Sequence, residues 1–430
     1  MGDDVVKVGL LGCGHVGGAL VRLIAEHRDV IEARSGVRLE VTRVAVRNLA
    51  LEREVPLPAS VFTHDANEVV TDPEVDLVVE VIGGIEPARE LIVQALKAGK
   101  PVVTANKELL ANVGQELFET AEGAGVDLLF EASVAGGIPL IRPLRESLAG
   151  DRIRRVMGIV NGTTNYILTR MAESGASFSD ALAEAQTLGY AERDPTADIE
   201  GFDAAAKAAI IATIAFGARV VAGDVYREGI SELTDADIAS ARELGYVVKL
   251  LAVAEEHPEG IAARVHPTML PAKHPLAAVR ESFNALFIEA DAVGELMLYG
   301  RGAGGGPTAS AVLGDVIDAA KNLVSGARGA TVGTLARKPI RPIDEVESQF
   351  YLQLEVADRP GVLAAIAEQF GRHAVSIKSM QQVGMGNDAR LIFITHTARE
   401  ADLRATVHAL REVEAVHRVG SVLRVMGDEA

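Results

Sequence analysis

Short apolar runs alternate with helical patterns of apolar positions through the first third of the chain. The runs typical of buried strands cover 5–11, 39–46, DLVVEVIGG from Asp76, PVVT up to Thr104, and 126–130. Helical patterns follow the first run and cover 87–98 and 109–121. Because strands that alternate with helices favour a parallel sheet, the pattern predicts an α/β fold. We expect 1–150 to form a Rossmann-type, doubly wound dinucleotide-binding domain.

The pattern of apolar positions changes after Arg152. A strand runs into a helix near Thr163, a second helix begins with Ser179 as its expected N-cap, and 261–299 is rich in strand patterns. The glycine-rich GRGAGGGP then precedes a long helix, which we expect to pack back on the first domain. We therefore predict an α+β substrate and dimerisation domain over 151–302, with 303–340 completing the first domain.

The C-terminal part follows a proline-bearing linker at 341–348. Residues 349–430 read strand, helix, strand, strand, helix, strand, which is a ferredoxin-like βαββαβ module. We expect this module to fold as a separate unit.

The composition narrows the functional classes. The net charge of −18 argues against nucleic acid or an anionic membrane as a partner, so we expect a small-molecule substrate. The longest apolar stretch, 208–218, is shorter than the roughly 20 residues that span a bilayer, and we expect a cytoplasmic location. A single cysteine, Cys13, excludes an intramolecular disulfide.

The first strand leads into a glycine motif. Gly12, Gly14 and Gly17 form G-x-G-x-x-G between a strand and a helix, which is typical of a pyrophosphate cradle. A glycine turn that binds no ligand is the alternative. At the end of the second strand, Arg47 stands where an acid would contact the ribose 2′-hydroxyl, and an arginine suits a 2′-phosphate. The alternative is an ordinary surface arginine.

A lone lysine in an apolar helix suggests catalysis. Lys207 lies within AAAKAAIIATIAF, and Asp203 precedes it by four residues, so both face one side of a helix. Reduction of a carbonyl requires a proton donor within hydrogen-bond reach, and Lys207 fits that role. An ordinary helix-surface ion pair is the alternative, which the apolar surroundings disfavour.

Several motifs together resemble one enzyme family. GLLGCGHVG, TANK, EASVAGGIPL, NGTTNYIL, GYAERDPTADIEGFDAAAK and GAGGGPTASAVLGDV look like homoserine dehydrogenase, and ADRPGVLAAIAEQF resembles an ACT domain. The resemblance implies reduction of L-aspartate 4-semialdehyde to L-homoserine with NADPH or NADH, on the path to threonine and methionine. It also implies L-threonine as an effector at the ACT domain; a purely dimerising module is the alternative.

The resemblance assigns roles residue by residue. Lys207 becomes the proton donor, Lys107 assists catalysis and contacts the cofactor, and Glu192, Asp198 and Asp203 form the substrate pocket. The cofactor-binding set becomes Gly12, Cys13, Gly14, His15, Val16, Gly17, Arg47, Lys107, Gly189 and Gly304. A sodium-like monovalent cation would be held by Glu131 and by the carbonyl groups of Val134, Gly136 and Ile138; an ordinary tight turn is the alternative.

Two other functional classes remain at this point. One is another amino-acid-linked NAD(P) oxidoreductase that acts on a different carbonyl or an imine. The other is a non-catalytic sensor, which would not need Lys207 beside Asp203 and Glu192. The resemblance implies a homodimer or homotetramer.

Overall fold

The computed structural model describes residues 5–384 and 389–427. The chain divides into two compact units. The first unit contains the residues up to 156, 206–225 and 283–338, and the second contains 157–205, 226–282 and the residues from 339 onward. The boundary passes through strand β7 (Ile153–Ile159) and helix α9 (Phe202–Phe216).

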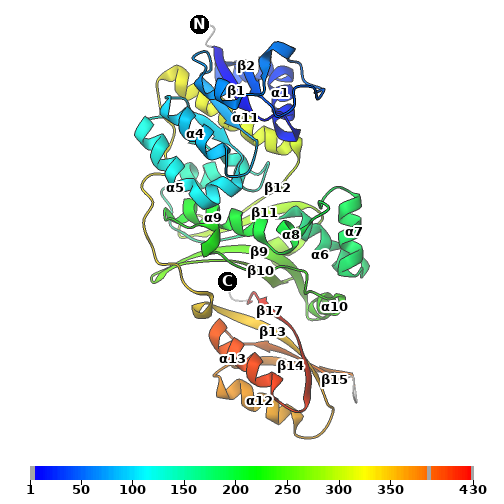
Figure 1. The fold of residues 1–430 in the computed structure, drawn as a ribbon. Helices are drawn as coiled ribbons and strands as arrows, with labels where there is room; N and C mark the ends of the chain where they lie inside the picture. Colours follow the sequence, from blue (N-terminus) through cyan, green and yellow to red (C-terminus); the bar gives the residue numbers. More distant parts are fainter. Residues whose placement is uncertain (1–4, 385–388, 428–430) are drawn as a thin grey trace. The chain divides into compact units, whose positions relative to one another are not determined.

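A six-stranded parallel sheet forms the centre of the first unit (Figure 1). Its strands lie in the order β3-β2-β1-β4-β5-β6, which is the order of the Rossmann fold. The strands are β1 (Val5–Leu11), β2 (Arg38–Ala45), β3 (Phe62–Thr63), β4 (Leu77–Glu80), β5 (Val102–Thr104) and β6 (Leu128–Leu129). The predicted doubly wound α/β fold is confirmed.

Helices α1 (His15–Glu26), α4 (Ala88–Lys97), α5 (Lys107–Ala124) and α11 (Gly305–Ser325) agree with the apolar pattern. The sequence pattern did not predict α2 (Arg28–Ser35) or α3 (Ala66–Thr71). Strand β6 is shorter than the expected 126–130, because the Val126 amide donates to the Ala121 carbonyl at the end of α5. An antiparallel pair, β11 (Phe283–Ala290) and β12 (Gly294–Arg301), precedes α11.

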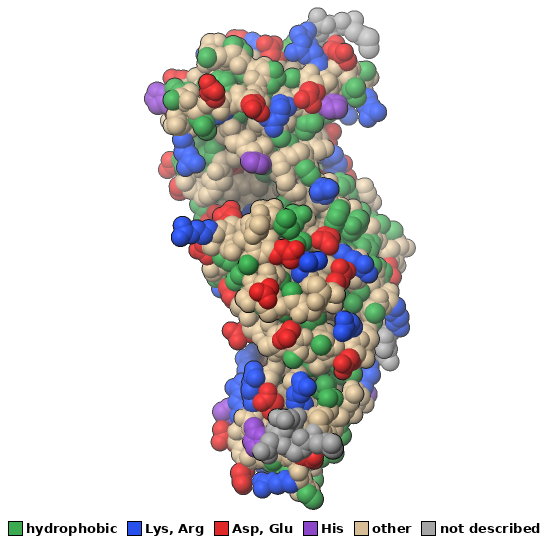
Figure 2. Space-filling view, turned by 90° about the vertical axis from the view of Figure 1, so that its right-hand side faces the viewer, with side chains coloured by type: hydrophobic (Ala, Val, Ile, Leu, Met, Phe, Trp, Pro, Cys, Tyr) green, Lys and Arg blue, Asp and Glu red, His purple; other side chains and the backbone are tan. Residues whose placement is uncertain are grey.

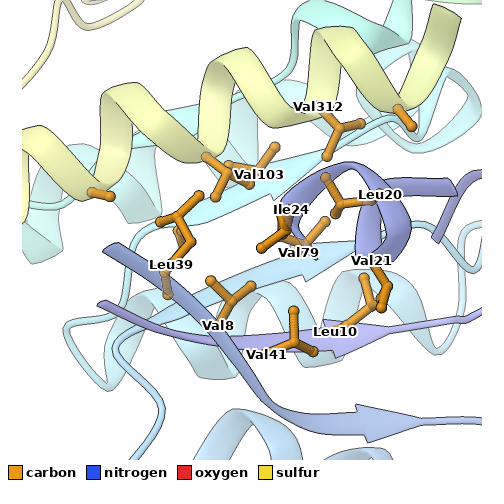
Figure 3. Packing of buried hydrophobic residues seen from close by; sticks show 14 of the residues in the cluster. Val8, Leu10, Leu20, Val21, Ile24, Leu39, Val41, Val79, Val103 and Val312 are labelled. Carbon is orange, nitrogen blue, oxygen red and sulfur yellow. The ribbon is translucent and has the colours of Figure 1, made fainter. Parts of the chain in front are cut away.

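Helix α11 packs on the dinucleotide-binding sheet, as the sequence predicted. Its buried face supplies Ala309, Val312 and Val316 to the core that contains β1, β4 and α1. Figure 3 shows Val312 reaching from α11 toward Leu20 of α1. The chain thus returns after residue 300 to complete its first sheet domain.

The second unit contains a mixed sheet. Strands β9 (Tyr246–His257) and β10 (Gly260–Pro271) form an antiparallel hairpin, and the two-residue strand β8 (Tyr226–Arg227) pairs with β10. The helices are α6 (Gly162–Ser174), α7 (Phe178–Thr187), α8 (Thr196–Ile199) and α10 (Asp235–Glu243). The predicted N-cap of α7 is wrong: Ser177, not Ser179, accepts the Asp180 amide, at 3.2 Å.

The C-terminal module has the predicted βαββαβ order. Its elements are β13 (Glu347–Val356), α12 (Val362–Arg372), β14 (Ile377–Val383), β15 (Ala389–Thr395), α13 (Glu400–Arg411) and β17 (Val416–Val425). A two-residue strand, β16 (Ala398–Arg399), pairs with β13. The module has its own core, with Phe350, Phe370 and Phe393 among the buried residues.

The module is nevertheless not isolated from the rest of the second unit. Strand β17 pairs in parallel with β10, through Thr268 opposite Arg424 and Met269 opposite Val425. The Met426 amide adds a hydrogen bond to the Met269 carbonyl at 2.9 Å. The sheet therefore continues in the order β9-β10-β17-β13-β15-β14, and a separate unit at 349–430, as the sequence suggested, does not describe the packing.

Acidic and basic side chains are interspersed over the face shown in Figure 2, where no large basic surface gathers among the described residues. None of the helices in 5–384 and 389–427 has the length and apolar character needed to cross a bilayer.

Lys249 is a buried ammonium group in the second unit. It lies in β9 with 2% of its surface exposed, and its Nζ donates to Asn165 Oδ1 (2.8 Å) and to the Val279 carbonyl (2.5 Å). Burial lowers the pKa of Lys249 from 10.5 to about 8; the charge of Glu173 opposes this shift and that of Arg280 adds to it.

Replacing Lys249 with methionine should change how stability depends on pH. Between pH 8 and 10.5 the unfolded chain keeps the lysine proton while the folded protein has lost it. The wild type should therefore gain stability relative to Lys249→Met as the pH rises through this window, by up to about 3 kcal/mol. Below the window both states are protonated, so the difference should level off. Free energies of unfolding measured at several pH values across the window test this. Lys97→Met, at an exposed position, is the control. The prediction would be contradicted if the stabilities of wild type and Lys249→Met changed in parallel with pH.

Candidate active site

The glycine loop has the geometry of a dinucleotide cradle. Gly12 has a φ of 99°, which favours glycine, and helix α1 begins directly after Gly14 without a side-chain cap. A Cβ on Gly17 would lie 2.2 Å from the Gly12 carbonyl oxygen, so close packing requires glycine there. A Cβ on Gly14 would meet no atom within 4 Å. The loop thus offers an open backbone surface at a helix N-terminus, which suits a pyrophosphate.

The second glycine loop meets the first. Gly304 has a φ of 116° and precedes α11, and a Cβ on Gly305 would lie 3.1 Å from the His15 carbonyl oxygen. The N-termini of α1 and α11 therefore lie close together, and neither has a side-chain cap. His15, Gly14 and Gly304 are exposed at this point, so the backbone there is accessible to an anion.

A pocket of about 300 Å³ within the first unit brings four of the predicted residues together. It is lined by Val16 of the glycine loop, Lys107 at the start of α5, Gly136, and Lys207 of α9. Asn106, Ser133 and Thr308 add polar groups to the same lining. An ammonium group beside a dinucleotide-type loop is an arrangement that can donate a proton to a reduced carbonyl oxygen.

Helix α9 is buried as predicted. Asp203 is 8% and Lys207 9% exposed, and the apolar residues between and after them are almost all buried. Phe202, the first residue of α9, is exposed. The Arg227 guanidinium lies 3.4 Å from the centroid of the Phe202 ring. The apolar environment excludes the reading of Asp203 and Lys207 as a solvent-exposed surface pair.

Three polar residues that were not assigned a role from the sequence organise the pocket wall. The fully buried Glu80 carboxylate accepts the amides of Ile82 (2.8 Å) and Gly83 (3.1 Å) and the Thr104 hydroxyl (2.6 Å). Asn106 donates to the Gly84 carbonyl at 2.7 Å and caps α5. Glu80 and Thr104 are the last residues of neighbouring parallel strands. Their position at the carboxyl ends of two predicted strands is the sequence signal that could have identified them.

In the second unit, Asn161 joins two of the predicted substrate acids. Its Nδ2 donates to Asp198 Oδ1 at 2.7 Å and to Asp203 Oδ2 at 2.9 Å, while its Oδ1 accepts the Thr164 amide and caps α6. Asn161 is the first residue of the NGTTNYIL motif, so the motif carried the signal although the residue was not singled out. Bridged in this way, the two carboxylates are held at a fixed separation.

Glu192 and Gly189 lie in an exposed loop of the second unit. Gly189 has a φ of 77°, the Tyr190 carbonyl accepts the Thr163 hydroxyl at 2.7 Å, and the Glu192 carbonyl accepts Gln186 Nε2 at 3.0 Å. The backbone of the loop is therefore anchored while the Glu192 carboxylate remains accessible. The roles of Glu192 and Gly189 toward substrate and cofactor stay predictions.

Arg47 lies exposed two residues after β2, beside the strand that leads into the glycine loop. Cys13 is buried, and burial raises the pKa of its thiol, although the charges of Arg53 and Arg22 oppose the shift. A thiol with a raised pKa is a weak nucleophile, so the amide of Cys13 is the group available to a ligand.

The predicted cation turn is tightly folded. Ala135 and Gly136 have φ values of 57° and 55°. The buried Glu131 carboxylate accepts the amides of Leu140 (2.5 Å), Ile141 (2.8 Å) and Arg142 (2.8 Å), a structural role that the sequence did not reveal. A carboxylate can accept about four hydrogen bonds, so capacity remains for a cation. The turn thus fits a hard cation in the chemistry of its donors.

Comparison with known protein families gives three matches along the chain. The model for the homoserine dehydrogenase NAD-binding domain matches residues 12–131, the homoserine dehydrogenase model matches 139–317, and the ACT domain model matches 350–415. The first match begins at the glycine loop, and the third covers most of the βαββαβ module.

Relatives match over nearly the whole length. The chain is 52% identical to a homoserine dehydrogenase of Corynebacterium glutamicum, over 99% of this chain and 96% of that protein. A Mycobacterium tuberculosis homoserine dehydrogenase is 50% identical, with 99% of each chain covered.

Solved structures show the same architecture. A homoserine dehydrogenase from Thiobacillus denitrificans superposes with a TM-score of 0.92 at 44% identity, over 98% of both chains. A hyperthermophilic archaeal homoserine dehydrogenase in complex with NADPH superposes with a TM-score of 0.63 at 32% identity, over 73% of this chain and 97% of that one.

The geometry and the comparisons agree. A Rossmann sheet with an open glycine cradle indicates a nicotinamide cofactor, and a lysine in the adjoining pocket indicates carbonyl reduction. Family matches and relatives cover both the dinucleotide-binding region and the region that follows it. The non-catalytic sensor is excluded. The chain belongs to the homoserine dehydrogenase family of NAD(P)-dependent oxidoreductases and carries a C-terminal ACT domain.

Proposed function

We propose that this enzyme reduces L-aspartate 4-semialdehyde to L-homoserine with NADPH, in the biosynthesis of threonine and methionine. The observation that carries the proposal is the pocket that joins Lys207 and Lys107 to the glycine loop. The cofactor, when bound, supplies the hydride. An aldehyde becomes an alcohol when it gains a hydride at carbon and a proton at oxygen, so this chain has to provide the proton.

The side chains divide this work. Lys207 donates the proton to the developing alkoxide, and the Asp203 carboxylate, one helical turn away on α9, favours the protonated amine. Asp203, Asp198 and Glu192 bind the ammonium group and the hydroxyl of the substrate by charge-assisted hydrogen bonds. Lys107 contributes a second positive charge to the pocket and contacts the cofactor. The hydrogen bonds from Asn161 preorganise Asp198 and Asp203 for this task.

A monovalent, sodium-like cation completes the proposed site. Glu131 and the carbonyl oxygens of Val134, Gly136 and Ile138 would hold it in the tight turn. A Cβ on Gly136 would lie 2.3 Å from the Gly302 carbonyl oxygen, and both glycines line the pocket of Lys207. The cation would therefore act by fixing the pocket wall.

Three further properties belong to the same proposal. Arg47 gives a preference for NADPH over NADH. L-threonine binds the ACT domain at the ADRPG loop, where Gly361 has a φ of 90° and α12 begins without a side-chain cap. The enzyme is cytoplasmic and assembles as a homodimer or homotetramer.

Lys207→Met should lower kcat by roughly 10²–10⁴-fold, because a general acid contributes about that much. NADPH binding, followed by nicotinamide fluorescence, should survive. The rate is the loss of reduced-nicotinamide absorbance when aspartate semialdehyde is added to the wild type and the variant. Lys321→Met, on the exposed part of α11, is the control and should keep full activity. Near-normal turnover by Lys207→Met would contradict the role of Lys207 and would make Lys107 the first candidate for the proton donor.

Arg47→Ala should reduce the ratio of kcat/KM for NADPH to that for NADH by roughly tenfold or more, because arginine binds phosphate by charge-assisted hydrogen bonds. The matched control is Arg38→Ala, at the start of β2, the strand that Arg47 follows. A wild type that uses both coenzymes equally, with a ratio unchanged in Arg47→Ala, would remove Arg47 from the cofactor site.

Gly361→Ala should weaken inhibition by L-threonine and leave the uninhibited rate close to that of the wild type. A methyl group there would enter open space at the N-terminus of α12 and strain the left-handed backbone. Gly371→Ala is the control, because that methyl also meets open space but lies inside the same helix. Initial rates over a range of threonine concentrations measure the effect. A wild type indifferent to threonine would leave a dimerising role for the ACT domain.

A further inference from the structure

A buried arginine joins the last strand of the ACT domain to the region that follows α9. Arg424 of β17 is 5% exposed, and its two terminal nitrogens donate to the two carboxylate oxygens of Glu228 at 2.8 and 2.9 Å. Its Nε donates to Glu400, the first residue of α13. All three residues belong to the second unit, in which β17 lies beside β10 (Figure 1).

The carboxylates around Arg424 keep its buried guanidinium charged. Burial alone would lower the pKa of Arg424, but the hydrogen bonds and charges of Glu228 and Glu400 raise it, so the guanidinium stays ionised. Burial would raise the pKa of Glu228, but its bonds to Arg424 hold it below the usual value. Burial and the charges of Arg424 and Arg264 hold the pKa of His266 well below its usual value, so that imidazole is neutral. Loss of Arg424 would leave buried carboxylates without this counter-charge.

Glu228 is in turn held against the segment that carries the substrate acids. Its amide donates to the Val265 carbonyl at 2.8 Å. A Cβ on the next residue, Gly229, would lie 2.3 Å from the Ile199 carbonyl oxygen and 2.7 Å from Glu200 Cα. The Ile230 amide donates to that same Ile199 carbonyl at 2.8 Å. Backbone packed this closely leaves no room for independent movement of the two segments.

Ile199 and Glu200 lie between Asp198 and Asp203 in the sequence. The Ser231 hydroxyl adds a 2.7 Å hydrogen bond to Glu200 Oε1, and Asn161 joins the two aspartates. A displacement of Glu228 would therefore be transmitted to the backbone that directs both carboxylates.

We propose that Arg424 is a positioning residue for substrate binding: through Glu228 it fixes the 198–203 segment, so the last strand of the ACT domain sets the affinity for the substrate's ammonium group. The inference rests on the proposed substrate-binding role of Asp198 and Asp203. It also gives the ACT domain a part in the basal reaction, in addition to the effector binding that the sequence resemblance implies. An effector that shifts β17 would act on the KM for the aldehyde.

Arg424→Met tests this in the full-length enzyme, with the KM for aspartate semialdehyde, the KM for NADPH and the melting temperature measured together. We expect the aldehyde KM to rise roughly tenfold or more, since small misplacements of binding groups have effects of about this size. The KM for NADPH should stay within about twofold of the wild type, because both glycine loops and Arg47 lie in the first unit. Arg418→Met is the matched control: Arg418 lies in the same strand but pairs with Glu355 at an exposed position, so both KM values should be unchanged.

A second variant tests the proposal if Arg424→Met does not fold. Glu228→Gln keeps the shape of the side chain and removes the charge that Arg424 binds. It should raise the aldehyde KM in the same direction, and combining it with Arg424→Met should give less than the sum of the two effects. A folded Arg424→Met or Glu228→Gln enzyme with wild-type aldehyde KM would overturn the proposal, as would equal rises in both KM values. A wild type that does not reduce aspartate semialdehyde would instead overturn the proposed function.

Discussion

Helix α9 is the constraint on which the proposed chemistry depends. A regular α-helix places residues four apart on one face and about 6 Å apart along its axis, so Asp203 and Lys207 keep one relative position. The helix is buried along nearly its whole length, so Lys207 has little exposure apart from the pocket that it lines. The unit boundary passes between Ala205 and Ala206 of this helix, so Asp203, a proposed substrate ligand, belongs to the second unit and Lys207 to the first. Small alanine side chains allow that degree of burial.

The parallel sheet supplies the second half of the site. Crossover helices bring the carboxyl ends of β1, β4 and β5 to one edge, where the glycine loop, Glu80 and Thr104 follow one another. The Glu80 carboxylate accepts hydrogen bonds from two backbone amides and one hydroxyl. Its charge therefore stabilises the loop at the pocket wall. The chain returns through α11 to place a second uncapped helix N-terminus beside the first. The same segment therefore completes the fold and contributes to the proposed cofactor site.

The second unit contains two buried basic side chains whose partners differ. Lys249 and Arg424 are both taken out of water, but Lys249 binds neutral oxygens while Arg424 binds two carboxylates. The difference appears in their pKa values, which burial lowers to about 8 for Lys249 and which the carboxylates raise for Arg424. An ionised group with buried partners can hold two segments in one geometry, because any other arrangement would leave a charge unpaired.

The sequence by itself determined the elements and the family. Periodicity and glycine positions predicted the Rossmann sheet, the packing of α11 and the βαββαβ order, because these depend on local pattern. The family resemblance assigned Val16, Lys107, Gly136 and Lys207 to the cofactor, catalytic and cation sites, and the structure places all four around one pocket. The tertiary structure alone decided which polar groups are paired: Asn161 with two acids, Glu131 with backbone amides, Arg424 with Glu228. Such pairings join residues far apart in sequence, so no local pattern encodes them, and they exist only once burial has removed water as a competing partner.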